Sequence, residues 1–248
     1  MRTANPALNE KVFTQYPRLA VGEAMTIEGT VNKTGLLLLV VMLAAFYTWG
    51  RFTAGQTQLV NILMLGGVLG GLIMALVTAF KPAWSPMTAP IYAALEGLFL
   101  GGISAFANRY YPGVVFQAVL LTFGVAFSLL AAYRSGLIRA TENFKLGLAA
   151  ATGGILFIYL VSFALSFFGW RIPFIHQSGL IGIGFSMFVV VIAALNLVLD
   201  FDFIEQGAAQ GAPGFMEWYG AFGLMVTLVW LYIEILNLLM KLQGGSRE

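Results

Sequence analysis

Residues 59 to 80 read LVNILMLGGVLGGLIMALVTAF, a stretch in which Asn61 and Thr78 carry the only polar side chains. An α-helix crosses the hydrocarbon core of a bilayer with about 20 residues. Lipid offers backbone groups no hydrogen-bond partners, so only helices and closed barrels span it. The stretch is too long and too uniformly apolar for a barrel strand, in which polar and apolar residues alternate. It therefore predicts a transmembrane helix.

Six more apolar segments follow the same pattern, and hydrophobic residues make up 59% of the chain. Charged residues make up 10%, where a soluble domain carries about 25%. The expected spans are residues 35–50, 59–80, 86–107, 113–133, 145–169, 178–203 and 215–242. The first is short and should borrow residues from its flanks, and short links make successive spans antiparallel neighbours. The sequence thus predicts an all-α integral membrane protein with seven transmembrane helices.

Polar residues at both ends frame one transmembrane domain. We assign residues 1–34 to a polar N-terminal tail, 35–242 to the seven-helix transmembrane domain and 243–248 to a polar C-terminal tail. The N-terminal tail lacks the short apolar core and the small-residue cleavage site of a signal peptide. With the N-terminus inside, the inner segments hold eight Lys and Arg residues and the outer ones five. The positive-inside rule favours this orientation.

Several functional classes are excluded by the composition. The net charge of +2 gives no case for a nucleic-acid partner, and the absence of cysteine excludes disulfides, thiol nucleophiles and cysteine metal sites. No HExxH, GxSxG or paired-aspartate protease motif is present, and the lone His176 has no cluster of potential ligands around it. We therefore expect neither an enzyme nor a bound cofactor. The lipid bilayer is the first expected partner, and the oligomeric state stays open.

Glycines recur at helical spacing in two of the spans. The second span carries two overlapping GxxxG patterns, and the third span carries one; their glycines are Gly66, Gly67, Gly70, Gly71, Gly97 and Gly101. Small residues at this spacing let helix backbones approach closely in lipid. The pattern predicts tightly packed helix pairs.

Three acids lie inside predicted spans, namely Glu96, Asp200 and Glu234. An ionisable residue costs a few kcal/mol at this depth, so it usually faces the interior of the helix bundle. Asp200 shares a helix face with Asn196, one turn earlier, whereas Asp202 lies about 200° around the helix from Asp200. We therefore expect Asp200 to point inward and Asp202 to mark the end of the span at the water.

The last span carries the strongest polar pattern. One helical face, at steps of three and four residues, consists of Thr227, Trp230, Glu234, Asn237 and Lys241. A lipid-exposed helix would not carry such a stripe, so it should face the bundle core or a cavity. An acid there either binds protons or cations on a pathway or ties helices together by hydrogen bonds. The carboxylate within a stripe favours the first interpretation for Glu234, and neither is favoured for Glu96.

Two inward carboxylates that come close to each other cannot both ionise cheaply. Such a pair would share a proton when closed. On losing the proton it would gain charge, repel and offer oxygen ligands to a hard cation such as Ca²⁺. The acids therefore suggest a pH-gated cation site.

These residues also carry a resemblance to a known family. The motifs are NPALNEKVF, MTIEGTVNKTGLLLL, PIYAALEGLFLGGIS, LNLVLDFDFIEQG and VWLYIEILNLLMKL, and they touch most of the chain. In order and spacing the chain resembles a bacterial member of the Bax inhibitor-1/YccA-like family of membrane proteins. The resemblance implies a cytoplasmic (inner) membrane location and a fold in which six helices surround a central, C-terminal seventh.

The resemblance also implies a function. Characterised relatives have a Ca²⁺ leak activity and a pH-sensing latch made of one acid late in the sixth helix and one in the seventh. On the motifs, Asp200 takes the first position and Glu234 the second, where the family more often has Asp; these two would be the ligands of a transported Ca²⁺. The expected pathway residues are Asp200, Glu234, Glu96, Asn196, Asn237 and Asp202. The alternative is a non-transporting regulator that binds a membrane-embedded protease, as some members are thought to do, with residues 1–34 as the contact.

The spacing of the two acids leaves their pairing open. Asp200 and Glu234 are 34 residues apart, more than is usual in the family. With a turn at residues 207–214, they would lie about 10 Å and about 30 Å from it at 1.5 Å per residue. Either residues 207 to 222 include a non-helical or re-entrant stretch, or Glu234 pairs with Glu96, which lies on a helix running in the same direction.

Overall fold

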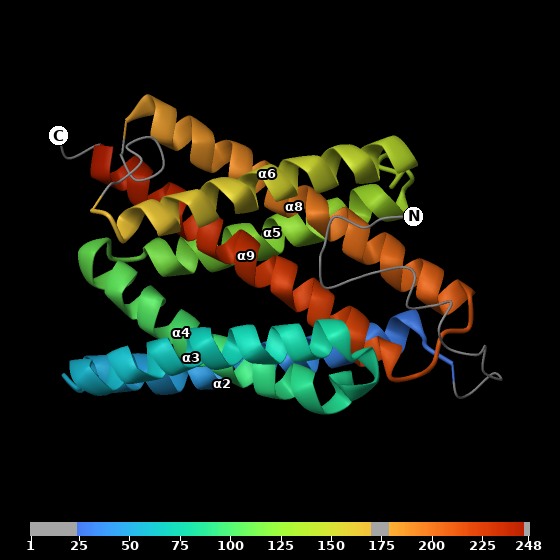
Figure 1. The fold of residues 1–248 in the computed structure, drawn as a ribbon, viewed down its shortest axis with the longest axis horizontal. Helices are drawn as coiled ribbons and strands as arrows, with labels where there is room; N and C mark the ends of the chain where they lie inside the picture. Colours follow the sequence, from blue (N-terminus) through green and yellow to red (C-terminus); the bar gives the residue numbers. More distant parts are fainter. Residues whose placement is uncertain (1–23, 170–178, 246–248) are drawn as a thin grey trace. The chain divides into compact units, whose positions relative to one another are not determined.

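The structure is a computed structural model that describes residues 24–169 and 179–245. In these ranges seven helices are long and apolar enough to cross a membrane, and they confirm the predicted all-α architecture. The helices are α2 (Ile27–Thr53), α3 (Thr57–Phe80), α4 (Ser85–Tyr110), α5 (Val114–Arg134), α6 (Glu142–Ser166), α8 (Leu180–Ala209) and α9 (Met216–Gly245), and the 3₁₀ turn η1 (Pro82–Trp84) leads into α4 (Figure 1). Residues 1–23 of the N-terminal tail, His176 and the last three residues lie outside the described part of the chain.

The first span is longer than its apolar stretch. Helix α2 begins at Ile27 because Thr26 caps it, with its side-chain oxygen accepting a hydrogen bond from the Gly29 N–H at 2.9 Å. The helix therefore draws residues 27–34 from the polar segment. This is the extension expected of a span that was too short by itself.

The chain divides into two compact units. Among the described residues, unit 1 holds 24–110 and 200–226, and unit 2 holds 111–169, 179–199 and 227–245. Helices α8 and α9 each contribute one part to either unit. The predicted arrangement of six helices around a seventh concerns both units together and stays a prediction.

Unit 1 is built on close helix contacts at glycines. Helix α4 packs against α2 and α3, whose ribbons are the blue and cyan helices of Figure 1. A Cβ atom at Gly67 would lie 2.6 Å from the carbonyl oxygen of Leu95, and one at Gly97 would overlap the carbonyl oxygen of Val41. At Gly66 a Cβ would meet nothing within 4 Å. The glycine pattern thus serves helix packing at some of its positions and not at all of them.

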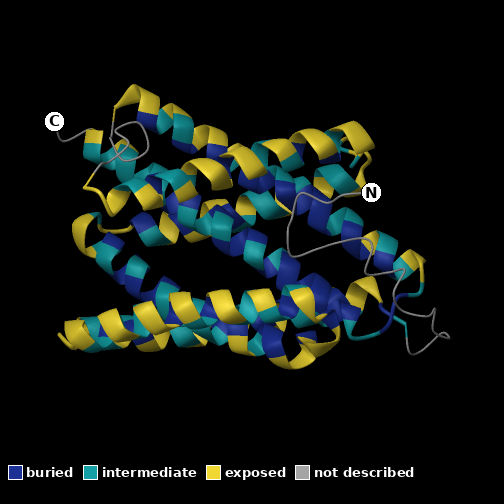
Figure 2. Cartoon of the chain, in the orientation of Figure 1, coloured by how far each residue is buried: buried dark blue, intermediate teal, exposed yellow. Residues whose placement is uncertain are grey.

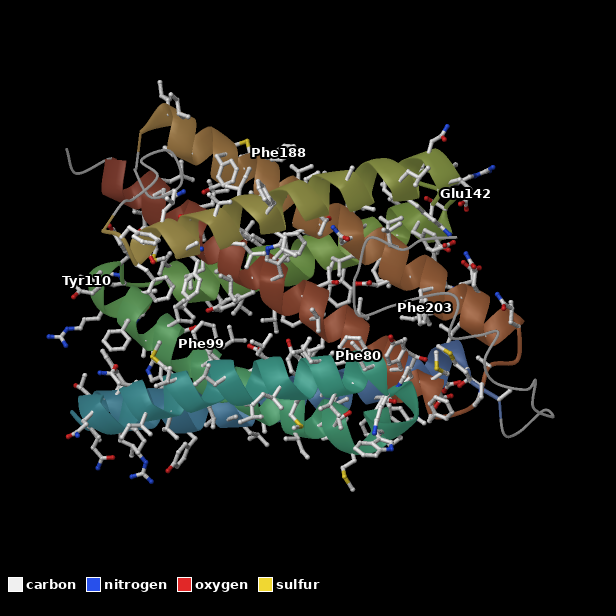
Figure 3. The ribbon with its side chains drawn as sticks, in the orientation of Figure 1. Phe80, Phe99, Tyr110, Glu142, Phe188 and Phe203 are labelled. Atoms are coloured by element: carbon white, nitrogen blue, oxygen red, sulfur yellow. The ribbon has the colours of Figure 1, made fainter. Side chains whose placement is uncertain are left out.

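One hydrophobic cluster of unit 1 lies around the turn between α8 and α9. Phe203, labelled in Figure 3, is fully buried and packs in one cluster with Met25, Met216 and Tyr219. The backbone N–H of Met25 donates to the carbonyl oxygen of Ala212 at 2.6 Å. The residues just before α2 are therefore held against this turn.

The seven spans differ in how much of their surface is covered. In α9, 61% of the most apolar stretch is buried, against 17% in α3, so α9 presents little side-chain surface to lipid (Figure 2). Phe188 on α8, labelled in Figure 3, is 50% exposed. Exposed apolar side chains of this kind are expected where a helix contacts lipid tails. In unit 2, Leu148 and Ile155 of α6 pack on Val189 and Ile192 of α8.

Candidate functional site

Helix α9 runs without a break from Met216 to Gly245. The non-helical stretch predicted within residues 207 to 222 is confined to the short turn between Ala209 and Met216, with Gly211 at φ 68°, and α9 is helical from there on. Gly220 lies inside α9, where a Cβ would come within 3.3 Å of side chains of Ile204 and Thr30. This glycine allows close packing and does not interrupt the helix.

The Glu234 carboxylate is buried, and only one of its two oxygens accepts hydrogen bonds from the described residues. The side chain is 4% exposed. The Tyr159 hydroxyl on α6 donates to Oε1 at 2.9 Å, and the Trp230 indole N–H donates to the same oxygen at 3.2 Å. Within the described part of the chain, no residue donates a hydrogen bond to Oε2. The carboxylate is thus oriented by two donors, and its second oxygen stays available for a donor or a cation.

A cavity of about 680 Å³ lies beside this carboxylate, entirely within unit 2. Its volume falls in the usual range of ligand pockets. It is lined by Tyr111, Tyr159, Ser162, Phe163, Ser166, Phe185, Ser186, Ile233, Glu234, Asn237, Met240 and Lys241. Hydroxyl groups, one amide and one charge of each sign share the wall with aromatic and aliphatic side chains. Water molecules inside this cavity would therefore find hydrogen-bond partners in its wall.

Lys241 ends the polar stripe and also faces this cavity. Its ammonium donates to the Ser186 hydroxyl at 2.6 Å and to the Gly182 carbonyl oxygen at 3.2 Å. These bonds tie the last part of α9 to the first turns of α8. Lys241 belongs to the predicted polar stripe but not to the predicted pathway residues, although it lies two helical turns after Glu234. Tyr159 and Ser186 lie on other helices, and no sequence pattern pointed to them.

Asn196 connects two helices of unit 2. Its side-chain N–H groups donate to Thr152 Oγ1 at 3.0 Å and to the Ile192 carbonyl at 2.8 Å. Its Oδ1 is buried and accepts no hydrogen bond from the described residues. In this structure Asn196 joins α8 to α6, and its role on an ion pathway stays a prediction.

The acids at the end of the sixth span differ in burial. Asp200 is fully buried, as an inward acid must be. Asp202 is partly exposed and accepts a hydrogen bond from Gln206 Nε2 of the same helix at 2.6 Å. Asp200 belongs to unit 1 and Glu234 to unit 2, so the Asp200–Glu234 pair stays a prediction.

Glu96 lies in unit 1, on the face of α4 that meets α3. A Cβ atom at Gly71 would come within 3.3 Å of the Glu96 Oε1. The glycine therefore leaves the room that the carboxylate occupies. A Glu96–Glu234 pair also joins the two units and stays a prediction.

Unit 1 contains a charged cluster that the sequence did not predict. Glu217, in the first turn of α9, forms an ion pair with Lys33 of α2. Its Oε1 also accepts hydrogen bonds from the Thr26 N–H at 2.8 Å and from the Thr26 hydroxyl at 2.7 Å. The Lys33 ammonium lies 5.6 Å from the centroid of the Trp218 ring. The partners are some 190 residues apart in sequence, so no local pattern could reveal them.

Comparison with known proteins gives one match. A family model described as Bax inhibitor 1 like matches residues 5–244, nearly the whole chain, and confirms the resemblance seen in the motifs. No curated protein and no solved structure matches.

Proposed function

The chain belongs to the Bax inhibitor 1 like family and is a multi-pass membrane protein, and from this premise we propose that it is a pH-sensitive cation leak channel with Ca²⁺ as the expected ion. The observation that carries the proposal is the Glu234 carboxylate, buried in α9 with one oxygen held by Tyr159 and Trp230 and with a cavity beside it. We place the channel in a bacterial cytoplasmic membrane. We expect it to be neither an enzyme nor a holder of a resident cofactor.

The cavity lowers the free-energy cost of an ionised acid at this depth in the membrane. An isolated charge inside a membrane costs a few kcal/mol, and neighbouring polar groups or water reduce that cost. About 680 Å³ corresponds to roughly twenty water molecules at about 30 Å³ each. The other titratable groups that line the cavity are Lys241, Tyr111 and Tyr159.

The pH dependence follows from the free carboxylate oxygen. Protonated Glu234 is neutral and does not attract a cation. When the proton leaves, the carboxylate becomes a negatively charged ligand in the cavity wall. Cation flux is therefore expected to rise with pH through the range in which Glu234 ionises. Asp200 is the proposed second acid, and Asn237 adds an amide oxygen to the same wall.

The described residues suit a passing ion better than a tightly bound one. Ca²⁺ in a storage site takes six to eight oxygen ligands at about 2.3–2.6 Å. Among the described residues there is no group of three or more His, Cys, Asp or Glu side chains that could hold a metal. A single carboxylate in a wet cavity favours an ion that keeps most of its water, as a leak requires.

The test is Ca²⁺ flux into liposomes that contain the purified protein, at pH 6, 7 and 8. The variants are Glu234→Gln, Asp200→Asn and Glu96→Gln, with Glu28→Gln as the control that removes an exposed acid from α2. The proposal expects a wild-type flux that rises with pH and a loss of this dependence in Glu234→Gln but not in Glu28→Gln. Flux equal to that of empty liposomes at every pH would overturn it. That result would favour the regulator that binds a membrane-embedded protease through residues 1–34.

A further inference from the structure

The cavity beside Glu234 reaches the helix ends on one face of the membrane, and we infer that its mouth lies there. Tyr111 lies between α4 and α5, Ser166 ends α6, Gly182 lies near the start of α8, and Lys241 lies near the end of α9. Because successive spans cross in opposite directions, these helix ends all lie on the same side of the bilayer. With the N-terminus inside, this is the outer side.

Glu234 lies deeper than Lys241 in the same cavity. The two residues are seven positions apart on a continuous helix, which is about 10 Å along the axis. An ion that enters from the mouth therefore passes the Lys241 ammonium before it reaches the carboxylate. Both side chains line the cavity wall.

The Lys241 ammonium is fixed to the wall. A lysine near the end of a span usually extends its flexible stem so that the charge reaches water. Here the ammonium donates instead to Ser186 and to the Gly182 carbonyl, at the start of the neighbouring helix. The positive charge therefore keeps a defined place in the cavity.

We propose that Lys241 is the charge filter of this cavity and sets the ratio of divalent to monovalent inorganic cations that reach Glu234. The inference rests on the proposed function and adds a residue that determines its specificity. The work of passing a fixed positive charge grows in proportion to the charge of the ion. A divalent cation is therefore hindered by the square of the factor that hinders a monovalent one. The Lys241 charge therefore slows Ca²⁺ more strongly than it slows K⁺, and its removal should raise the Ca²⁺ leak more.

The first experiment tests the cavity and its charge without any transport. The chain has no cysteine, so a single introduced thiol is the only one present. Ser162→Cys places it on the cavity wall of α6, and Leu160→Cys places it on the same helix at a side chain that is 57% exposed and does not line the cavity. Each thiol is treated in liposomes with membrane-impermeant cationic and anionic methanethiosulfonate reagents, with Lys241 intact and with Lys241→Gln.

The filter predicts two results. Ser162→Cys reacts from the mouth side and Leu160→Cys does not. In the Lys241→Gln background the ratio of cationic to anionic reaction rates at Ser162→Cys rises about tenfold, because a fixed positive charge is removed. A Ser162→Cys that reacts with neither reagent would overturn the water-accessible cavity, and an unchanged ratio would overturn the role of Lys241.

The second experiment measures K⁺ and Ca²⁺ flux for Lys241→Gln, Lys241→Arg and the control Lys81→Gln, which removes a cation from the end of α3. If K⁺ flux rises about threefold in Lys241→Gln, Ca²⁺ flux should rise about tenfold. Lys241→Arg and Lys81→Gln should keep the wild-type ratio. Measurable flux with an unchanged ratio would overturn the filter and leave the channel standing. If no variant carries flux, the channel proposal fails, and the thiol reaction rates still decide the role of Lys241.

Discussion

Helix α9 carries two buried glutamates whose surroundings differ. Glu217 and Glu234 are 9% and 4% exposed. Glu217 in unit 1 pairs with Lys33 and accepts two hydrogen bonds from Thr26. Glu234 in unit 2 has two donors on one oxygen and a cavity next to it. Both glutamates are therefore buried, but among the described residues Glu217 has an ion-pair partner and donors that Glu234 lacks.

The difference shows what separates a structural acid from a candidate functional one. Glu217 stands in the first turn of α9 and accepts the N–H of Thr26, the cap of α2. At helix N-termini the unpaired N–H groups and the helix dipole stabilise a negative charge. Glu234 lies in mid-helix, where neither helps. Among the described residues no cation donates a hydrogen bond to this carboxylate, whose nearest cation in the cavity wall is Lys241, so it stays able to exchange a proton or to meet an ion.

The largest expected effect on stability is at Glu217. Glu217→Ala removes the partner of Lys33 and the acceptor for both Thr26 donors. We expect a loss of about 2–3 kcal/mol, below the value for a fully buried pair because Lys33 can still reach water. Thermal unfolding in detergent, followed by tryptophan fluorescence, measures it. Glu28→Ala is the matched control in the first turn of α2, and an equal shift in both variants would contradict the assignment.

The partner of Glu217 gives a second, smaller effect. Lys33→Met leaves the carboxylate with its Thr26 donors, and we expect a loss of about 1–2 kcal/mol. The double variant Lys33→Met with Glu217→Ala should cost less than the sum of the two single changes, because each removes the same ion pair. Unfolding in a double-mutant cycle gives the coupling. Strict additivity would show that the pair contributes nothing to stability.

Glu234→Gln should separate function from stability. The amide oxygen can still accept the hydrogen bonds from Tyr159 and Trp230, and the amide nitrogen takes the place of the oxygen that has no donor among the described residues. We therefore expect a change in unfolding free energy within about 1 kcal/mol together with the loss of the pH dependence of flux. The same unfolding assay and the liposome assay measure the two effects. A loss of stability as large as that of Glu217→Ala would mean that Glu234 is a structural acid.

Tyr159→Phe should have the smallest effect on flux, because it shifts the pH dependence and does not abolish it. It removes one of the two donors on Oε1 and leaves the packing of the ring against Phe185. We expect a cost of about 1 kcal/mol and a shift of the flux profile to higher pH, because the ionised carboxylate loses a stabilising donor. Flux measured in steps of half a pH unit resolves the shift. Tyr47→Phe on the exposed side of α2 is the control, and a profile that moves in neither variant would argue against Tyr159 as a positioning residue.

Two sequence interpretations show where local patterns succeed and fail. The polar stripe of the last span correctly placed Glu234, Asn237 and Lys241 on one wall, because a helical period is a local property. The non-helical stretch predicted within residues 207 to 222 is confined to the turn between Ala209 and Met216 and does not reach Gly220. Gly220 lies inside α9 and lets Ile204 and Thr30 pack close to the helix. From sequence alone, a glycine that interrupts a helix and one that allows packing look the same.

The seven apolar spans, the acids within them and the family could be predicted from the amino-acid sequence, because span length, helical period and motif order are local properties of the chain. Which of these acids has a hydrogen-bond or ion-pair partner depends on helix packing and could not be predicted. Tyr159 lies 75 residues before Glu234, and Lys33 lies 184 residues before Glu217. Partners at such separations are chosen by helix packing, where glycine contacts and burial set which faces meet. Two glutamates on one helix therefore differ: Glu217 forms an ion pair in unit 1, and Glu234 in unit 2 has one oxygen that no described residue donates to.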